Sequence, residues 1–204
     1  MSARESLWTV LRADIQRLKE DDGSLRCLVR GLCSQGFHAL LTYRLFRWCW
    51  ERGIPTQPVR FFVERAIEVA TGIQIPAEAR IGKGLRIHHF GGIILHPSVE
   101  LGEHCTIFHG VTLGETRTME GAPCVGNDVV MGAGAKILGR IRLGDGCRVG
   151  ANAVVLTSVP PHYVAVGVPA TLKPRKAALR PGLPEDNHAS AGLGRGGTRC
   201  STRA

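Results

Sequence analysis

The sequence predicts an α+β protein in which an N-terminal α-helical region, residues 1–72, precedes a left-handed parallel β-helix of hexapeptide repeats, residues 73–175. Between residues 81 and 159 an aliphatic residue opens each unit at a period of six, and glycine often follows it. A period of six fits neither an α-helix nor an alternating strand. Three such units close one triangular coil, and stacked coils bury a continuous aliphatic column. The unit-opening residues are Ile81, Ile87, Ile93, Leu101, Ile107, Leu113, Val125, Met131, Ile137, Leu143, Val149 and Val155.

A second inward position lies four residues after most of these openers and carries a small or aliphatic side chain. We expect these side chains to pack beside the openers, while the glycines allow the chain to bend tightly. The residues are Cys105, Val111, Val129, Ala135, Ile141, Cys147, Ala153 and Val159.

The segment before the repeats has the pattern of four helices. Residues 4–20 are expected to form an amphipathic helix, which residues 21–24 break. Further helices are expected over about residues 25–33, 37–51 and 59–70, with Gly72 ending the last and the coils beginning near Ile73. The apolar stripe of the first helix consists of Leu7, Val10, Leu11, Ile15 and Leu18.

The repeat pattern is interrupted once and then ends. Leu113 and Val125 lie twelve residues apart, which predicts that residues 115–124 form a loop ejected from the coils. The sequence Gly-Val-Pro at residues 167–169 is expected to close the solenoid. Residues 176–204 are expected to be a disordered basic tail, because the stretch from 181 onward is rich in Gly, Arg and Ser and has little to bury.

Composition and charge exclude several classes of protein. No run of 18 apolar residues exists, so no transmembrane span is expected, and residues 1–24 lack a signal-peptide core. The seven cysteines have no metal-type spacing, which predicts reduced thiols in the cytoplasm and no bound metal. Much of the net charge of +9 follows Thr171 without aromatic stacking residues. A solvated tail, or attraction of an anionic ligand, therefore fits better than nucleic-acid binding.

Three segments carry a resemblance to a known family. Residues 36–40 (GFHAL), with Tyr43-Arg44 and residues 48–50 (WCW), form a helical block; residues 132–139 read GAGAKILG; residues 159–162 and 166–170 read VPPH and VGVPA. With these motifs, residues 7–175 resemble the serine acetyltransferases of the hexapeptide-repeat acyltransferase superfamily. The resemblance implies an acetyl-CoA-dependent O-acetyltransferase that converts L-serine to O-acetyl-L-serine in cysteine biosynthesis by direct transfer. It also implies a homotrimer or a dimer of trimers.

The resemblance assigns the catalytic base to His89. The family's base lies in a coil of the form Asp-His-x-x-Gly, and residues 87–92 here read IHHFGG, with His88 in place of the aspartate. Transfer to a hydroxyl requires removal of its proton, and an imidazole that titrates near pH 6.5 suits that task. The family's second aspartate, which orients the base, is Gln74 here. A glutamine carbonyl accepts an imidazole N–H but carries no charge.

The acceptor half of the implied site is altered and the acetyl-CoA half is retained. Asp21 matches the family's acidic residue that contacts the substrate amine, and His88 is a second candidate for substrate binding. The family's Arg-His pair before a proline is replaced by residues 121–122 (GA). The resemblance implies three kinds of acetyl-CoA contact. Backbone amides would donate hydrogen bonds to the thioester oxygen, and small side chains would leave room for the pantetheine arm. Cations would bind the phosphates. These acetyl-CoA residues are Gly114, Glu115, Ala133, Ala151, Lys136 and Arg148.

The residues leave other functions open. Loss of the aspartate and of the Arg-His pair favours an O-acetyltransferase that acts on a sugar hydroxyl in exopolysaccharide biosynthesis. The spacing of His104 and His109 admits two ligands of a zinc hydratase like the γ-type carbonic anhydrases. A non-catalytic scaffold is a third alternative. The helical block and Asp21 favour serine as the acceptor, although the sequence alone does not identify it.

Overall fold

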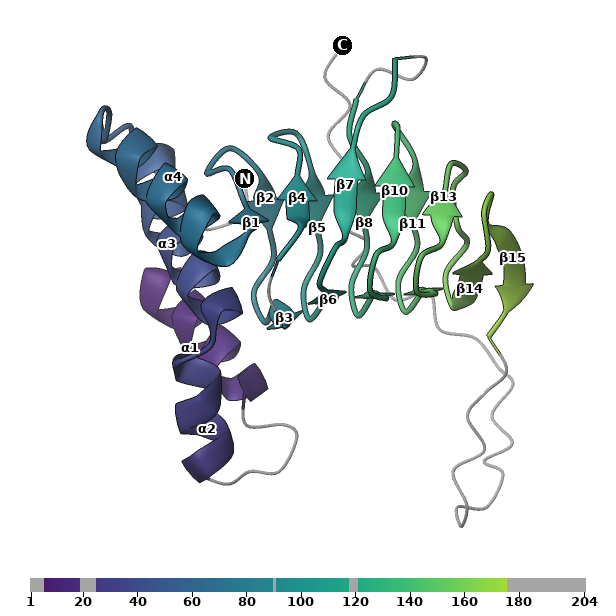
Figure 1. The fold of residues 1–204 in the computed structure, drawn as a ribbon, viewed down its shortest axis with the longest axis horizontal. Coiled ribbons are helices and arrows are strands. Elements are labelled where there is room, and N and C mark those ends of the chain that lie inside the picture. Colours follow the sequence, from purple (N-terminus) through teal and green to yellow (C-terminus); the bar gives the residue numbers. More distant parts are fainter. Residues whose placement is uncertain (1–5, 19–24, 90, 118–120, 176–204) are drawn as a thin grey trace.

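A computed structural model of the protein describes residues 6–18, 25–89, 91–117 and 121–175. In this part of the chain, four helices lie together at one end of a stack of short strands (Figure 1). The helices are α1 (Leu7–Leu18), α2 (Leu25–Leu32), α3 (Gln35–Glu51) and α4 (Val59–Thr71). The stack begins at Ile73, and its strands confirm the predicted fold class, a helical region followed by a parallel β-helix.

The strands form three sheets, which we call A, B and C, and each coil contributes one strand to each sheet in turn. Sheet A contains β1 (Ile73–Gln74), β4 (Ile93–Leu95), β7 (Thr112–Gly114), β10 (Lys136–Leu138) and β13 (Val154–Val155). Sheet B contains β2 (Arg80–Ile81), β5 (Glu100–Leu101), β8 (Cys124–Val125) and β11 (Arg142–Leu143). Sheet C contains β3 (Arg86–His88), β6 (Thr106–Phe108), β9 (Val130–Met131), β12 (Arg148–Val149), β14 (Tyr163–Val166) and β15 (Thr171–Pro174).

All neighbouring strands are parallel except the last pair. β15 turns back and runs antiparallel to β14, with Val164 opposite Lys173. The sequence Gly-Val-Pro at residues 167–169, which was expected to close the coils, lies between these two strands. The stack of parallel coils therefore ends at β14, and a reversed strand covers its edge in sheet C.

The core of the β-helix is the aliphatic column that the period of six predicts. Ile107 lies opposite Met131 and Met131 opposite Val149, so equivalent side chains stack from coil to coil. The second inward positions, from Cys105 to Val159, are buried as well. Burial of apolar surface is worth about 25 cal/mol per Å², so this column is the main source of stability for the coils.

One predicted opener is wrong. Leu95, not Ile93, lies opposite the opener Leu113, and Ile94 lies opposite Thr112. Ile93 is fully buried, but it occupies the second inward position of its coil. The six-residue spacing from Ile87 to Ile93 arises because this coil has two extra residues at the corner between sheets C and A.

The helical region departs from a simple amphipathic pattern at one residue. The predicted stripe of α1, from Leu7 to Leu18, is only partly buried, whereas Asp14 is fully buried. Helix α3 begins at Gln35, two residues before the predicted start, because the Ser34 side chain accepts a hydrogen bond from the backbone N–H of Phe37. Helix α4 ends at Gly72, which adopts a left-handed conformation with φ of 66° as a helix C-cap.

Within the described ranges, none of the helices has both the length and the apolar character that a membrane crossing requires.

The burial of the inward cysteines gives a test of the coil register. Burial raises the pKa of the Cys105 thiol to about 11, so about one-thousandth of it is thiolate at pH 8. We expect iodoacetamide at pH 8 to alkylate the exposed Cys33 in the native protein and to leave Cys105 unmodified, as measured by peptide mass spectrometry. Both should react after unfolding in urea. Equal alkylation of the two thiols in the native protein would contradict the inward position of Cys105.

Candidate active site

The candidate site is built on one corner of the β-helix, where the chain passes from sheet C to sheet A. We call it the C–A corner; it comprises residues 88–89, 91–92, 108–110, 132–134 and 150–152 of four successive coils. Its backbone forms a regular ladder. The N–H of Gly110 donates to the carbonyl of Gly91 at 2.9 Å, and the N–H of Gly134 donates to the carbonyl of His109 at 2.8 Å. The N–H of Asn152 continues the ladder to the carbonyl of Ala133 at 2.8 Å.

His89 lies where this ladder is interrupted. His88 pairs with Phe108, and Gly91 lies over His109, so His89 has no counterpart in the coil that follows. Two more residues separate positions 88 and 91 than separate 108 and 109. His89 has a positive φ of 64°, which a residue with a side chain adopts only at some cost. Its side chain is exposed. The two-residue insertion therefore presents an imidazole outside the regular wall of the β-helix.

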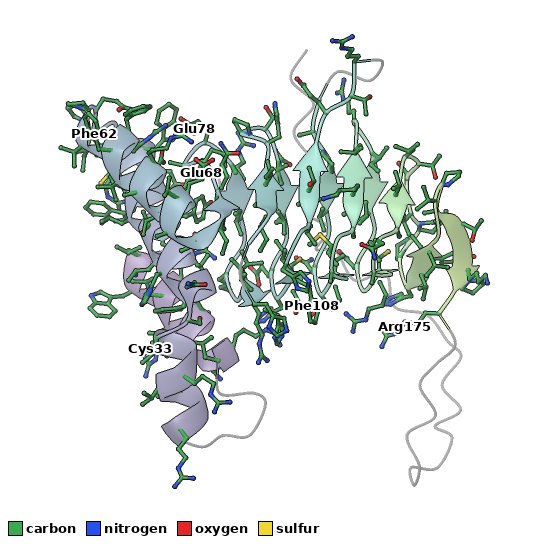
Figure 2. All side chains as sticks on the ribbon, viewed as in Figure 1. Cys33, Phe62, Glu68, Glu78, Phe108 and Arg175 are labelled. Carbon is green, nitrogen blue, oxygen red and sulfur yellow. The ribbon has the colours of Figure 1, made fainter. Side chains whose placement is uncertain are left out.

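Aromatic rings surround His89 on its own coil and on the next. The His89 ring centroid is 5.6 Å from that of His109, at an interplanar angle of 78°. His88 stacks on Phe108 with centroids 4.7 Å apart. Figure 2 shows Phe108 among nitrogen-bearing side chains at the outer side of sheet C. This arrangement limits the directions in which the imidazole can turn and leaves it open to a ligand from solvent.

The small residues predicted for acetyl-CoA lie on the same corner. Ala133 is aligned with His109, and Ala151 is aligned with Ala133 on the next coil. The structure thus brings His89 and the two alanines together along one edge of the β-helix. A column of small side chains leaves room for a long, narrow ligand beside the coils.

The two predicted phosphate-binding cations lie on opposite sides of the corner. Lys136 is on sheet A, where its Nζ donates to the carbonyl of Gly110 at 2.6 Å and to Oγ1 of Thr112 at 3.0 Å. Arg148 is on sheet C and donates to the carbonyl of Asp128 at 3.3 Å. Desolvation, followed by the positive charge of Arg175, lowers the pKa of Arg148. Desolvation penalises charge of either sign, whereas the positive charge of Arg175 is the contribution that a bound anion would offset.

Gly114 and Glu115 lie away from the C–A corner, at the other end of a sheet A strand. Gly114 ends β7 and accepts a hydrogen bond from the N–H of Gly139 at 2.8 Å. The Glu115 carboxylate lies 3.9 Å from Nε2 of His96. The loop that was expected over residues 115–124 begins here and rejoins the coils at β8. In one chain, the predicted site residues therefore form two groups. One lies where the sheet A strands begin, and the other lies where strand β7 ends.

Two predicted site residues, Gln74 and Asp21, remain. Gln74 is exposed on β1 and lines a cavity of about 100 Å³ between α3, α4 and β1, beside Glu64 and Glu68. Among the described residues, no hydrogen bond joins Gln74 to His89. Asp21 lies outside the described residues.

The structure brings forward two residues that sequence reasoning gave little weight. Phe108 stacks on His88, and His109 lies directly below the insertion. Their signal in the sequence is positional, because residues 107–110 (IFHG) form the end of β6 and the corner after it, in register with Ile87 and His88 of the coil before. His104, by contrast, lies before β6 and His109 after it, at opposite ends of one strand. No group of three His, Cys, Asp or Glu side chains in the described ranges is arranged to hold a metal ion.

Comparisons with known proteins agree with this geometry. The family model for the bacterial transferase hexapeptide (six repeats) matches residues 125–157. The serine acetyltransferase of Mycobacterium tuberculosis is 40% identical over 167 residues, which cover 79% of this chain and 71% of that protein. The crystal structure of Neisseria gonorrhoeae serine acetyltransferase in complex with serine aligns with a TM-score of 0.74 at 32% identity, over 81% of this chain and 68% of that one. Brucella abortus serine acetyltransferase in complex with coenzyme A gives 0.74 at 34% identity, over 83% and 69%.

Proposed function

The chain belongs to the serine acetyltransferase family, and on that premise we propose that it transfers the acetyl group of acetyl-CoA to the hydroxyl of L-serine. The products are O-acetyl-L-serine and coenzyme A. The observation that carries the proposal is the exposed His89, which a two-residue insertion presents at the top of a corner lined by Ala133 and Ala151. Serine and coenzyme A are bound by relatives in the solved structures that the chain resembles.

The proposed chemistry needs one proton carrier. His89 removes the proton of the serine hydroxyl as that oxygen attacks the thioester carbonyl, so that a C–O bond forms. The tetrahedral intermediate then collapses, the C–S bond breaks, and the proton passes from His89 to the coenzyme A sulfur. Backbone N–H groups at Gly114 and Glu115 are our candidates to stabilise the oxyanion. General base catalysis of this kind contributes about 10²–10⁴-fold to the rate.

The proposal assigns acetyl-CoA to the C–A corner and the faces beside it. Ala133 and Ala151 would admit the pantetheine arm. Of the two cations, Arg148 is the better candidate for a phosphate, because Arg175 and Arg17 add positive charge near it. Lys136 already donates two hydrogen bonds to the corner and sheet A, and would act by holding Gly110 and Thr112 in position.

The proposal includes a homotrimer. In one chain, the His89 group lies where the sheet A strands begin, and the Gly114 group lies where β7 ends. A neighbouring β-helix would be needed to bring its Gly114 group opposite this His89 group. Phe61, Phe62 and Val69 of α4 are exposed apolar side chains, which supports further pairing of trimers through the helices. Cys33, Cys49, Cys105, Cys124 and Cys147 are free thiols, in keeping with the cytoplasmic location that we propose.

Native mass spectrometry should give three or six times the chain mass of 22.0 kDa. The physical reason is that each site would be completed by a second chain. A monomer with full acetyl transfer activity would contradict this part of the proposal.

The function is tested by thiol release from acetyl-CoA with L-serine and, separately, with a panel of monosaccharides. We expect turnover with serine, and we expect His89→Ala to lower it at least about a hundredfold while the circular dichroism spectrum is unchanged. His162→Ala is the matched control, because His162 is also an exposed corner histidine with positive φ, of 59°. Turnover on a sugar but not on serine, or near-normal turnover by His89→Ala, would overturn the proposal.

The role of Gln74 is tested by replacing it with a charged residue and with an apolar residue. If its carbonyl orients His89, Gln74→Asp places a carboxylate beside the imidazole and stabilises the imidazolium form. The acid limb of the pH–rate profile should then move to higher pH. Gln74→Leu should lower the rate, because the imidazole N–H would lose the acceptor that orients the ring. If neither variant moves the limb or the rate, Gln74 does not touch His89, and His88 becomes the first candidate for the orienting group.

A further inference from the structure

The strand that leads into His89 is an edge strand. β3 ends the order of sheet C, with β6 on one side and, among the described residues, no further strand on the other. Helices α1 and α3 lie across this open end (Figure 1). The backbone of the first coil must therefore find its hydrogen-bond partners in the helices, because buried N–H and C=O groups without partners are costly.

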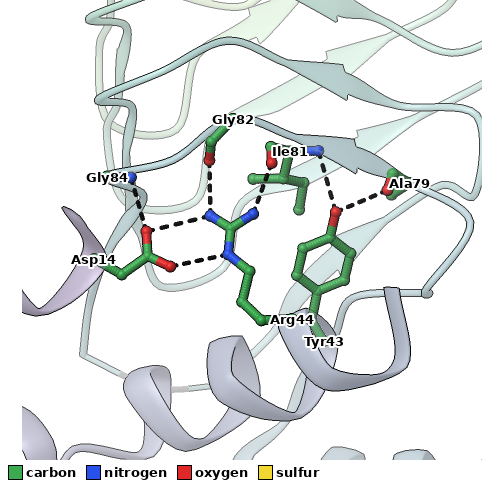
Figure 3. Close-up of polar contacts among 7 residues, drawn as sticks. All are labelled: Asp14, Tyr43, Arg44, Ala79, Ile81, Gly82 and Gly84. Carbon is green, nitrogen blue, oxygen red and sulfur yellow. Dashed lines mark hydrogen bonds and ion pairs between the residues drawn. The ribbon is translucent and has the colours of Figure 1, made fainter. Parts of the chain in front are cut away.

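Asp14 of α1 and Arg44 of α3 supply those partners (Figure 3). Their side chains are 0% and 5% exposed, with Nε of Arg44 2.9 Å from Oδ2 of Asp14 and its NH2 group 3.2 Å from Oδ1. The guanidinium also donates to the carbonyls of Ile81 and Gly82, both at 2.7 Å. Asp14 accepts a hydrogen bond from the N–H of Gly84 at 2.7 Å. Burial raises the pKa of Asp14, and Arg44 opposes this effect.

Two other residues of α3, Tyr43 and Gly36, also contact this part of the chain. The hydroxyl of Tyr43 donates to the carbonyl of Ala79 at 2.8 Å and accepts from the N–H of Ile81 at 3.1 Å. Gly36 packs directly on Ile87, where a Cβ would come within 2.8 Å of the isoleucine side chain. The helices thus hold the chain from residue 79 to residue 87, immediately before His88 and His89.

We infer that Asp14 and Arg44 are positioning residues for His89: their ion pair fixes the edge strand β3 and so the place of the imidazole relative to the C–A corner. This inference rests on the proposed function. Displacement of a catalytic group by about 1 Å can cost about a hundredfold in rate. After the insertion, the Gly91 carbonyl is held by the N–H of Gly110, and before it the chain is held by β3. A displacement of β3 should therefore move His89.

The inference separates turnover from acetyl-CoA binding. The candidate acetyl-CoA residues at 114–115, 133, 136, 148 and 151 belong to later coils, which are held by coils on both sides. Loosening β3 should therefore reduce kcat and leave the KM for acetyl-CoA nearly unchanged. A general loss of stability would not produce this split in protein that remains folded.

The test uses the full chain with Asp14→Asn and, separately, Arg44→Lys. Asparagine keeps the shape of Asp14 but loses its charge, and lysine keeps the charge of Arg44 but cannot form the same set of hydrogen bonds. Arg47→Gln is the control, because Arg47 also belongs to α3 and donates to first-coil carbonyls at Ala77 and Glu78, farther from β3. Kinetics are combined with hydrogen exchange of the peptide that contains residues 86–88.

We expect kcat to fall about tenfold or more in both test variants, with KM for acetyl-CoA within about twofold. Exchange should quicken at residues 86–88 and remain as in the original protein at residues 142–155. Arg47→Gln should retain its kcat. Unchanged kcat in folded test variants, or an equal fall in the control, would overturn the inference. Loss of the fold in both test variants would assign the pair to folding instead. Failure of the proposed function is distinguishable, because it appears as normal turnover by His89→Ala.

Discussion

The open end of the first coil is the constraint on which the rest of the structure depends. A β-helix satisfies its backbone by stacking coil on coil, and the first coil has no predecessor. Here Tyr43, Arg44 and Asp14 replace the missing coil with side-chain donors and acceptors. Burying an ion pair is not by itself stabilising, but this pair also satisfies two carbonyls and an N–H group that an apolar replacement would leave unpaired. Once the first coil is fixed, each later coil takes its register from the one before it.

The sequence predicts the coils well because their chemistry is local and repeated. Each inward position needs only an aliphatic side chain, and stacking follows from the repeat, so Ile107, Met131 and Val149 could be aligned before the structure was known. The error at Ile93 has a physical cause. The period counts residues along the chain, whereas the register counts residues between coils, and a two-residue insertion can preserve the first while it shifts the second. The loop after Gly114 was predicted because residues 115–124 depart from the repeat consensus, although the spacing of twelve from Leu113 to Val125 is a multiple of six.

The candidate site is less predictable because its residues come together through the stack. His89 was identified by resemblance, but the feature that sets it apart, an insertion over His109, depends on the pairing of two coils. Asp14 was not predicted as a buried residue, because a carboxylate is ordinarily expected to face solvent. In α1 it instead lies on the side that packs against the first coil. Its partner Arg44 lies thirty residues away on another helix. Regular coils repeat the same kinds of positions. The proposed catalytic residue His89 lies instead at an insertion that interrupts the repeat.

The reversed strand β15 has a consequence for growth. A stack of parallel coils ends in strands whose unpaired backbone groups can accept another molecule's strand, and such open edges favour fibres. In sheet C, β15 occupies the place that a further coil would take, and its direction is opposite to that of a parallel continuation. Pro174 removes one donor from the new edge. The helices cover the first coil and β15 covers the last parallel strand of sheet C, so both edges of that sheet are occupied and its length is fixed.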